Sequence, residues 1–278
     1  MALAADTLQQ LAALALTPVA AAAYQQLLGT LTTQLFSLPK PAIVGITGAQ
    51  GTGKSTLASL LVTELSSRGR RCAAVSLDDY YLPQQARARL ASQIHPLLAQ
   101  RGVPGTHEIA RALSDAEQVL AGQPVALPVF DKALDERRPD RPAVTLDLLL
   151  VEGWCLGLQA QSAAELVRPV NTLEVAEDPQ AHWRKYVNQQ LAGAYHDYFC
   201  LLKPLIWLKA PDWQSICRWR QRQEQQLWQQ HGAGMSDAQL QRFMLFFQRL
   251  TELSYQQLPA RANYTVVLNA LQQPTLSC

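Results

Sequence analysis

The sequence predicts an α/β fold with a mostly parallel five-stranded sheet, flanked by helices and preceded by an N-terminal helical extension. Three observations lead to this prediction. Short, nearly continuous apolar runs alternate with longer helical stretches, as in parallel sheets that are covered on both faces. A glycine-rich turn follows the first apolar run and opens a helix. The 278 residues, 48% of them hydrophobic, are enough for a large core.

Residues 1–38 and 39–278 are expected to form two units. Leucines at roughly helical spacing predict two or three helices over 1–38, packed as an extension on a main domain of residues 39–278. Strands are predicted at 42–47, 72–77, 146–151, 204–209 and 264–269. Helices are predicted at 54–67, 84–99, 108–121, 179–202, 212–230 and 236–256. This alternation implies right-handed crossovers and places ligands at the carboxyl ends of the strands.

Composition excludes several classes of partner. The net charge is only +2, from 24 basic and 22 acidic residues, so nothing attracts nucleic acid or an anionic membrane surface. The apolar stretch Leu11–Ala23 has no basic residue before it and is too short to span a bilayer. Five scattered cysteines predict free thiols, and five scattered histidines form no metal-ligand cluster. We expect a cytoplasmic protein; its oligomeric state cannot be inferred from the sequence.

The segment 48–55, Gly-Ala-Gln-Gly-Thr-Gly-Lys-Ser, fits the phosphate-binding pattern G-x-x-x-x-G-K-[ST]. Its backbone N–H groups can curl around an anionic phosphate at the positive end of the following helix, as in P-loop NTPases. Lys54 is expected to reach the β- and γ-phosphates of ATP, and the Ser55 hydroxyl is expected to bind Mg²⁺. The residues predicted to bind the nucleotide are Gly48, Ala49, Gln50, Gly51, Thr52, Gly53, Lys54, Ser55 and Thr56.

Acidic residues end two of the predicted strands. Asp78 and Asp79 leave the second strand, and Asp78 is the stronger candidate for a base that accepts a hydroxyl proton. Glu152 follows four aliphatic residues of the third strand and is predicted to bind Mg²⁺ directly or through water. The alternatives are a helix or turn cap for the aspartates and an isolated edge carboxylate for Glu152.

Two charged stretches have two interpretations each. Arg218, Arg220 and Arg222 lie on the predicted helix 212–230, where Arg220 points away from the other two. One of them can fold over a transferring phosphate, or the three can form a solvated face. The segment 131–141, within the proline-rich stretch 122–144, is either a solvated loop or a substrate contact.

Seven stretches taken together resemble a known family. They are Gly-Ile-Thr-Gly-Ala-Gln-Gly-Thr-Gly-Lys-Ser-Thr (45–56), Ser-Leu-Asp-Asp-Tyr-Tyr-Leu (76–82), Arg-Gly-Val-Pro-Gly-Thr-His-Glu (101–108), Phe-Asp-Lys (130–132), Val-Glu-Gly-Trp-Cys-Leu-Gly (151–157), Trp-Arg-Gln-Arg-Gln-Glu (219–224) and Gly-Met-Ser-Asp (234–237). The combination resembles the plant-type D-glycerate 3-kinase family and its microbial relatives, within the wider group of uridine kinase, phosphoribulokinase and pantothenate kinase.

The resemblance implies an ATP- and Mg²⁺-dependent kinase for a small-molecule hydroxyl, with D-glycerate or a similar hydroxy acid as the leading acceptor. Asp78 matches the family's catalytic aspartate and Arg220 the arginine of its lid, so the implied catalytic set is Asp78, Lys54 and Arg220. The residues implied to contact the acceptor are Asp79, Tyr81, Arg101, His107, Asp131, Lys132 and Arg138. Glu108 and Tyr80 depart from the family pattern on the acceptor side, which leaves the acceptor's identity open.

Two alternative functions remain. One is a kinase for a nucleoside, a pantothenate-like alcohol or a sugar phosphate. A nucleoside would use an aromatic slot such as Tyr80 and Tyr81, whereas a compact anion would use cations such as Arg101 and Lys132. The other is a nucleotide-dependent regulatory ATPase; the sequence lacks the Asn-Lys-x-Asp and Asp-x-x-Gly motifs of GTPases.

Overall fold

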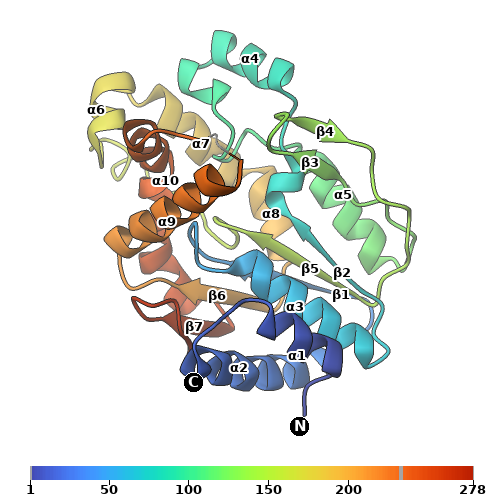
Figure 1. Cartoon of the computed structure of the whole chain (residues 1–278). Coiled ribbons are helices and arrows are strands. Elements are labelled where there is room, and N and C mark those ends of the chain that lie inside the picture. Colours follow the sequence, from blue (N-terminus) through green and yellow to red (C-terminus); the bar gives the residue numbers. More distant parts are fainter. Residues whose placement is uncertain (1, 232–233, 278) are drawn as a thin grey trace.

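The central sheet has six strands in the computed structural model, which describes residues 2–231 and 234–277. The strands are β1 Ala42–Thr47, β2 Cys72–Ser76, β5 Leu148–Gly153, β6 Leu205–Lys209, β7 Tyr264–Leu268 and β8 Pro274–Ser277. They lie in the order β2-β5-β1-β6-β7-β8, and all neighbours are parallel except β7 and β8 (Figure 1). The mostly parallel α/β sheet is therefore confirmed, but the prediction of five strands missed the antiparallel edge strand β8.

Both faces of the sheet are buried, which explains the apolar runs. Side chains alternate along each strand, so Ile43, Leu149 and Val151 enter one core while Val44 and Leu150 enter the other. A strand that must bury both faces has no polar side to show, and its sequence reads as a continuous hydrophobic segment.

Helices cover each face. The longer helices are α1 Ala5–Ala12, α2 Pro18–Phe36, α3 Lys54–Ser67, α4 Gln84–Gln93, α5 Ile109–Leu120, α7 His182–Ala192, α9 Trp213–His231 and α10 Asp237–Gln257. The shorter ones are η1 Leu77–Tyr80, η2 Pro96–Ala99, α6 Thr172–Glu177, α8 Ala194–Cys200 and η3 Leu258–Ala260. In Figure 1, α1, α2 and α3 lie on one side of the sheet and α5 and α8 on the other. The pair α1 and α2 packs on α3, and the division of the chain at residue 38 stays a prediction.

Two predicted helices are interrupted for local reasons. The helix expected over 84–99 stops at Gln93, because Pro96 disfavours helical geometry in the residue before it, and a short 3₁₀ turn follows. The helix expected over 179–202 begins at His182 and breaks at Gly193, where the backbone leaves the helical region. The short helix α6 was not predicted.

The irregular stretch 122–144 contains a small hairpin outside the main sheet. Its strands are β3 Val129–Asp131 and β4 Glu136–Arg138, and Figure 1 shows the hairpin beside α4. The hairpin is attached to η1, where the Phe130 N–H donates to a carboxylate oxygen of Asp79 at 3.3 Å. The hairpin therefore lies next to η1, which follows the carboxyl end of β2.

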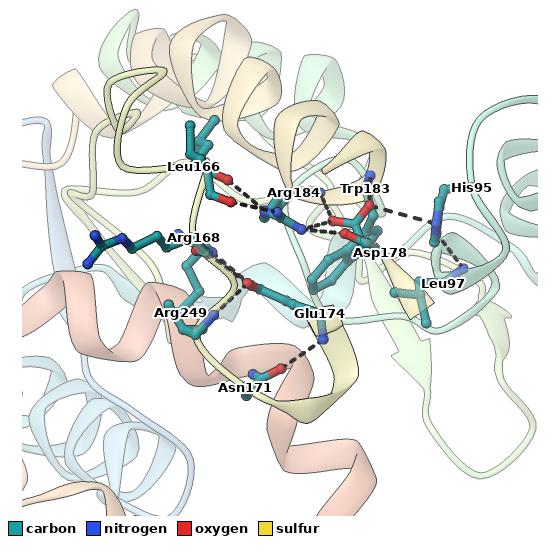
Figure 2. Close-up of polar contacts among 12 residues, drawn as sticks. His95, Leu97, Leu166, Arg168, Asn171, Glu174, Asp178, Trp183, Arg184 and Arg249 are labelled. Atoms are coloured by element: carbon teal, nitrogen blue, oxygen red, sulfur yellow. Dashed lines mark hydrogen bonds and ion pairs between the residues drawn. The ribbon is translucent and has the colours of Figure 1, made fainter. Parts of the chain in front are cut away.

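Buried ion pairs fix the segment around α6, as Figure 2 shows. Arg249 on α10 donates to both oxygens of Glu174, each at 2.7 Å, and Glu174 is 1% exposed. Arg184 on α7 pairs with Asp178 at 2.9 Å. These pairs join α6 to α10 and to α7. Among the described residues, no helix has the length and apolar character of a membrane span.

Replacing Arg249 with Ala should lower the free energy of unfolding by about 3–5 kcal/mol, because Glu174 is left as a buried charge without its partner. Arg242 is a matched control, since it also lies on α10 and pairs with a glutamate of α6, but at the surface. The Arg242→Ala change should cost less than about 1 kcal/mol. Urea denaturation of both variants measures the difference, and equal losses would show that burial of the Arg249 pair does not matter.

Candidate active site

The register of the parallel strands brings the predicted acids to the phosphate loop. Glu152 lies opposite Ile46 of β1 and opposite Ser76 of β2, so it sits between the ends of these two strands. The phosphate loop follows β1 directly, and Asp78 stands two residues after Ser76. All three features therefore meet at one edge of the sheet. Glu152 lies within β5 rather than after it, because the strand runs two residues further than the sequence predicted.

Two glycines shape the phosphate loop. Gly51 has a φ of 76°, and a Cβ there would lie 2.9 Å from the Cβ of Trp219 on α9. Gly53 has a φ of 85° and caps the start of α3, so the first N–H groups of this helix face the loop. The Lys54 ammonium donates to the Ala49 carbonyl at 3.0 Å inside the loop. Burial lowers the pKa of Lys54, and the carboxylates of Glu152 and Asp78 oppose part of that shift.

The two residues predicted to bind the metal, Ser55 and Glu152, contact each other. The Ser55 hydroxyl donates to Glu152 Oε1 at 2.8 Å, although the residues are 97 positions apart. Hydroxyl and carboxylate oxygens suit Mg²⁺, which binds few protein ligands and keeps water or phosphate oxygens on its other positions. The described residues contain no cluster of three or more His, Cys, Asp or Glu side chains able to hold a metal. The donor set thus fits Mg²⁺ held jointly with a phosphate.

Asp78 faces the cations of the site. Its carboxylate pairs with the Lys132 ammonium at 2.5 Å and accepts a hydrogen bond from the Tyr81 hydroxyl. Burial favours the neutral acid, but the ammonium of Lys132 together with the hydrogen bond from Tyr81 and other neighbouring groups lowers the pKa of Asp78. The side chain is therefore ionised at neutral pH and can accept a proton.

Asp79 points elsewhere. One of its oxygens accepts the N–H of Ser76 at 3.0 Å and completes a capping box at the start of η1, while the other accepts from Phe130. This is the capping role that the sequence left open for one of the two aspartates. Asp78 therefore lines the cavity described below, whereas Asp79 does not.

One large cavity connects these groups. It has a volume of about 870 Å³, within the range of small-molecule sites. The predicted residues that line it are Gln50, Gly51, Gly53, Lys54, Ser55, Thr56, Asp78, Tyr81, Arg101, Lys132, Glu152 and Arg220. Gly48, Ala49 and Thr52 belong to the same loop without lining the cavity.

The remaining residues predicted to contact the acceptor do not line the cavity. Asp79 is directed to η1 and the hairpin, as described above. Asp131 and Arg138 pair with each other across the hairpin at 2.6 Å. His107 is buried behind Tyr81, with the two rings stacked at 4.5 Å. Their contact with an acceptor stays a prediction.

The protonation of His107 follows from its neighbours. Tyr195 accepts the N–H of Gly105 at 2.9 Å, and its hydroxyl shares a second hydrogen bond with His107 Nδ1 at 2.7 Å. Burial lowers the pKa of His107 to about 4, although the nearby Asp78 carboxylate acts in the opposite direction. His107 is then neutral, and its buried Nε2 has no hydrogen-bond partner among the described residues.

Arg220, which the resemblance matched to a lid arginine, lines the cavity from α9. Its guanidinium pairs with Glu224 at 2.6 Å and lies over the ring of Phe243. Arg218 instead donates to Ser215 on the same helix. Met235, from the stretch 234–237, also lines the cavity.

Arg87, Asp135 and Gln272 are among the side chains of the site that were missed from the sequence. Arg87 and Asp135 line the cavity, and Gln272 donates to the Gly51 carbonyl at 2.6 Å. Asp135 falls in the charged stretch 131–141, for which the sequence offers substrate contact as one interpretation. Arg87 follows no motif that separates it from Arg89, and Gln272 reaches the loop only because β8 folds back on β7.

Comparison with known proteins gives matches of different extent. The family model of Methylmalonyl Co-A mutase-associated GTPase MeaB matches residues 12–81, which include the phosphate loop. The uncharacterized kinase mug58 of Schizosaccharomyces pombe is 32% identical over 219 residues, which are 74% of this chain and 78% of that protein. The chloroplastic D-glycerate 3-kinase of Arabidopsis thaliana is 28% identical over 218 residues, which are 73% of this chain and 45% of that protein. The solved structure of D-glycerate 3-kinase from Cryptococcus neoformans has the same fold, with a TM-score of 0.74 at 24% identity over 91% of this chain and 98% of that one.

Buried neutral His107 predicts a specific loss of stability in acid. Between pH 6.5 and about pH 4 the unfolded chain binds a proton at this residue that the folded chain excludes. The free energy of unfolding should therefore fall as the pH drops through this window, by at most about 1.4 kcal/mol per pH unit from this residue. Urea denaturation at pH 7 and pH 5 should show a smaller acid loss for His107→Gln than for the wild type. The exposed His182, replaced in the same way, is the control, and equal acid losses in wild type and His107→Gln would contradict the prediction.

Proposed function

We propose that this chain, which belongs to the P-loop kinase family that includes D-glycerate 3-kinase, phosphorylates a hydroxyl group of a small hydroxy acid, with D-glycerate as the leading candidate. The ATP-dependent kinase activity follows from the family. The proposal for the acceptor is carried by one observation: the cavity that holds Lys54, Ser55 and Asp78 is also lined by Arg101 and Lys132, two cations outside the phosphate loop.

The proposed roles on the nucleotide side follow from position. The phosphate loop and the N-terminus of α3 would bind the phosphates through backbone N–H groups, and Lys54 would contact the β- and γ-phosphates. Ser55 and Glu152 would hold Mg²⁺, which supplies neutralisation of phosphate charge when bound. Arg220 would exchange its Glu224 partner for a phosphate oxygen, as an arginine acting from the same chain.

On the acceptor side, Asp78 would accept the hydroxyl proton as the phosphoryl group transfers. Its carboxylate is held in place by Lys132 and Tyr81, so it is oriented before an acceptor binds. Lys132 also keeps it ionised. The residues position the reacting groups and balance their charge, which is the main contribution of proteins to phosphoryl transfer.

The two tyrosines considered for a nucleoside slot are not free to stack on a base. Tyr80 is 1% exposed, and its hydroxyl donates to Asp115 inside the core at 3.0 Å. Tyr81 is covered by His107 and Phe130. Neither ring offers two open faces between which a base could stack, whereas the cations are at the cavity surface. These contacts support an anionic acceptor.

A screen for ATP consumption tests the proposal directly. Purified protein would be given MgATP with hydroxy acids, nucleosides, sugar phosphates and pantothenate, with D-glycerate first, and NMR would identify the phosphorylated position. We expect turnover with D-glycerate or a hydroxy acid of similar size. Turnover only with a nucleoside or pantothenate would contradict the acceptor class, and ATP consumption without any acceptor would favour a regulatory ATPase.

Replacing Asp78 with Asn should lower kcat by about 10²–10⁴-fold with the best acceptor, because the base is lost, while the KM for ATP changes little. Steady-state kinetics with varied ATP and acceptor measure both constants. Asp79→Asn is the informative comparison, since its main effect should be a lower melting temperature through the lost cap of η1. If only Asp79→Asn loses the rate, Asp78 is not the base.

A further inference from the structure

Two arginines of the cavity share one carboxylate of the protein itself. Asp135 lies in the turn between β3 and β4, in the left-handed region with a φ of 54°. Arg87 Nη2 contacts one oxygen of Asp135 at 2.5 Å, and Arg101 Nη1 contacts the other. All three side chains line the cavity that contains Lys54 and Asp78. A carboxylate of the protein itself thus forms ion pairs with two guanidinium groups inside the candidate site.

The two arginines differ in how firmly they are held. Arg87 is 2% exposed and donates to the carbonyls of Leu82 and Ala99 as well as to Asp135, so it is fixed in the wall. The Arg101 side chain is 24% exposed, and it lies over the ring of Phe130. Of the two, Arg101 is the one that a ligand in the cavity can reach.

If a ligand replaced Asp135 as the partner of Arg101, each of the charged groups involved would still have a partner. If a carboxylate from outside takes over Arg101, Asp135 still has Arg87, and Arg87 still has its backbone carbonyls. Removing a buried charge from its partner is strongly unfavourable, so a site that avoids this step can exchange partners more easily. Burial disfavours ionised Asp135, but the two arginines outweigh it and lower the pKa of Asp135, which keeps this carboxylate charged.

Lys132 connects this carboxylate site with the candidate base. Its backbone carbonyl accepts from Arg101 Nη2 at 2.9 Å, and its ammonium pairs with Asp78. Arg101 and Asp78 therefore both contact one residue, Lys132. A molecule that places a carboxylate on Arg101 and a hydroxyl at Asp78 would be a hydroxy acid.

Resting on the proposed function, we infer that Arg101 binds the carboxylate of the acceptor and that Asp135 competes with the acceptor for this guanidinium. Asp135 thereby sets the affinity for anionic acceptors. In the absence of an acceptor, Asp135 is the negatively charged partner of Arg101. The opposite role, a fixed brace that only shapes the pocket, predicts the opposite effect of removing its charge.

Asp135→Asn tests this difference. Removal of the competing charge should lower the KM for D-glycerate by about two- to fivefold, the size expected for a partly exposed ion pair, with the KM for ATP unchanged. Asp135→Glu, which keeps the charge, should stay close to the wild type. Asp140→Asn is the matched control, because Asp140 also pairs with an arginine, Arg111, but does not line the cavity. Glyceramide, the uncharged amide of glycerate, should gain nothing from Asp135→Asn.

Arg101→Gln provides the second measurement, which does not depend on how well Asp135→Asn folds. Propionate, a carboxylate without a hydroxyl, should inhibit the wild type competitively against D-glycerate, and Arg101→Gln should lose this inhibition. Melting temperatures establish that each variant is folded. Two results would overturn this inference without affecting the proposed function. One is a folded Asp135→Asn variant with an unchanged or higher KM for D-glycerate, and the other is propionate inhibition that persists in Arg101→Gln. A wild type that phosphorylates only uncharged acceptors would overturn the proposed acceptor class and this inference with it.

Discussion

The hydrogen bond between Ser55 and Glu152 is the contact on which the rest of the site depends. It joins the first turn of α3 to the end of β5, and it forms because β5 is paired with β1 on one side and β2 on the other. The same register brings the phosphate loop after β1 and Asp78 after β2 to one edge. A shift of one residue in β5 would turn Glu152 to the opposite face of the sheet, away from α3. The chemistry of the site is therefore a consequence of strand register.

Each of the described charged side chains that line the cavity has a partner within the protein. Asp78 pairs with Lys132, Arg101 with Asp135, and Arg220 with Glu224. A ligand entering such a site replaces existing partners, so these described side chains of the cavity are not left unpaired before binding. The partners also orient the side chains, since each holds a long or flexible group in one direction. Binding can then proceed by exchange at each contact.

Much of the nucleotide side could be predicted from the sequence, because its signals are local. The loop 48–55, the helix that starts at Lys54 and the acid Glu152 lie in short continuous patterns whose geometry is set by neighbouring residues. The acceptor side was predicted less completely. Arg87 and Asp135 come together from α4 and the β3–β4 turn, and Gln272 arrives from the loop before β8. Such contacts depend on how distant segments pack, which no local pattern in one sequence records. Asp131 and Arg138 show the converse, since charged residues beside a site can satisfy each other.

The most direct test of the Ser55–Glu152 contact is the effect of Mg²⁺ on nucleotide binding, measured by calorimetry with a non-hydrolysable ATP analogue. The wild type should bind the analogue more tightly when Mg²⁺ is present. Glu152→Gln keeps the shape of the side chain and should bind the analogue without Mg²⁺ as the wild type does, while most of the gain from Mg²⁺ is lost. A Glu152→Gln variant that retains the full gain from Mg²⁺ would contradict the assignment of Ser55 and Glu152 as the metal-binding pair.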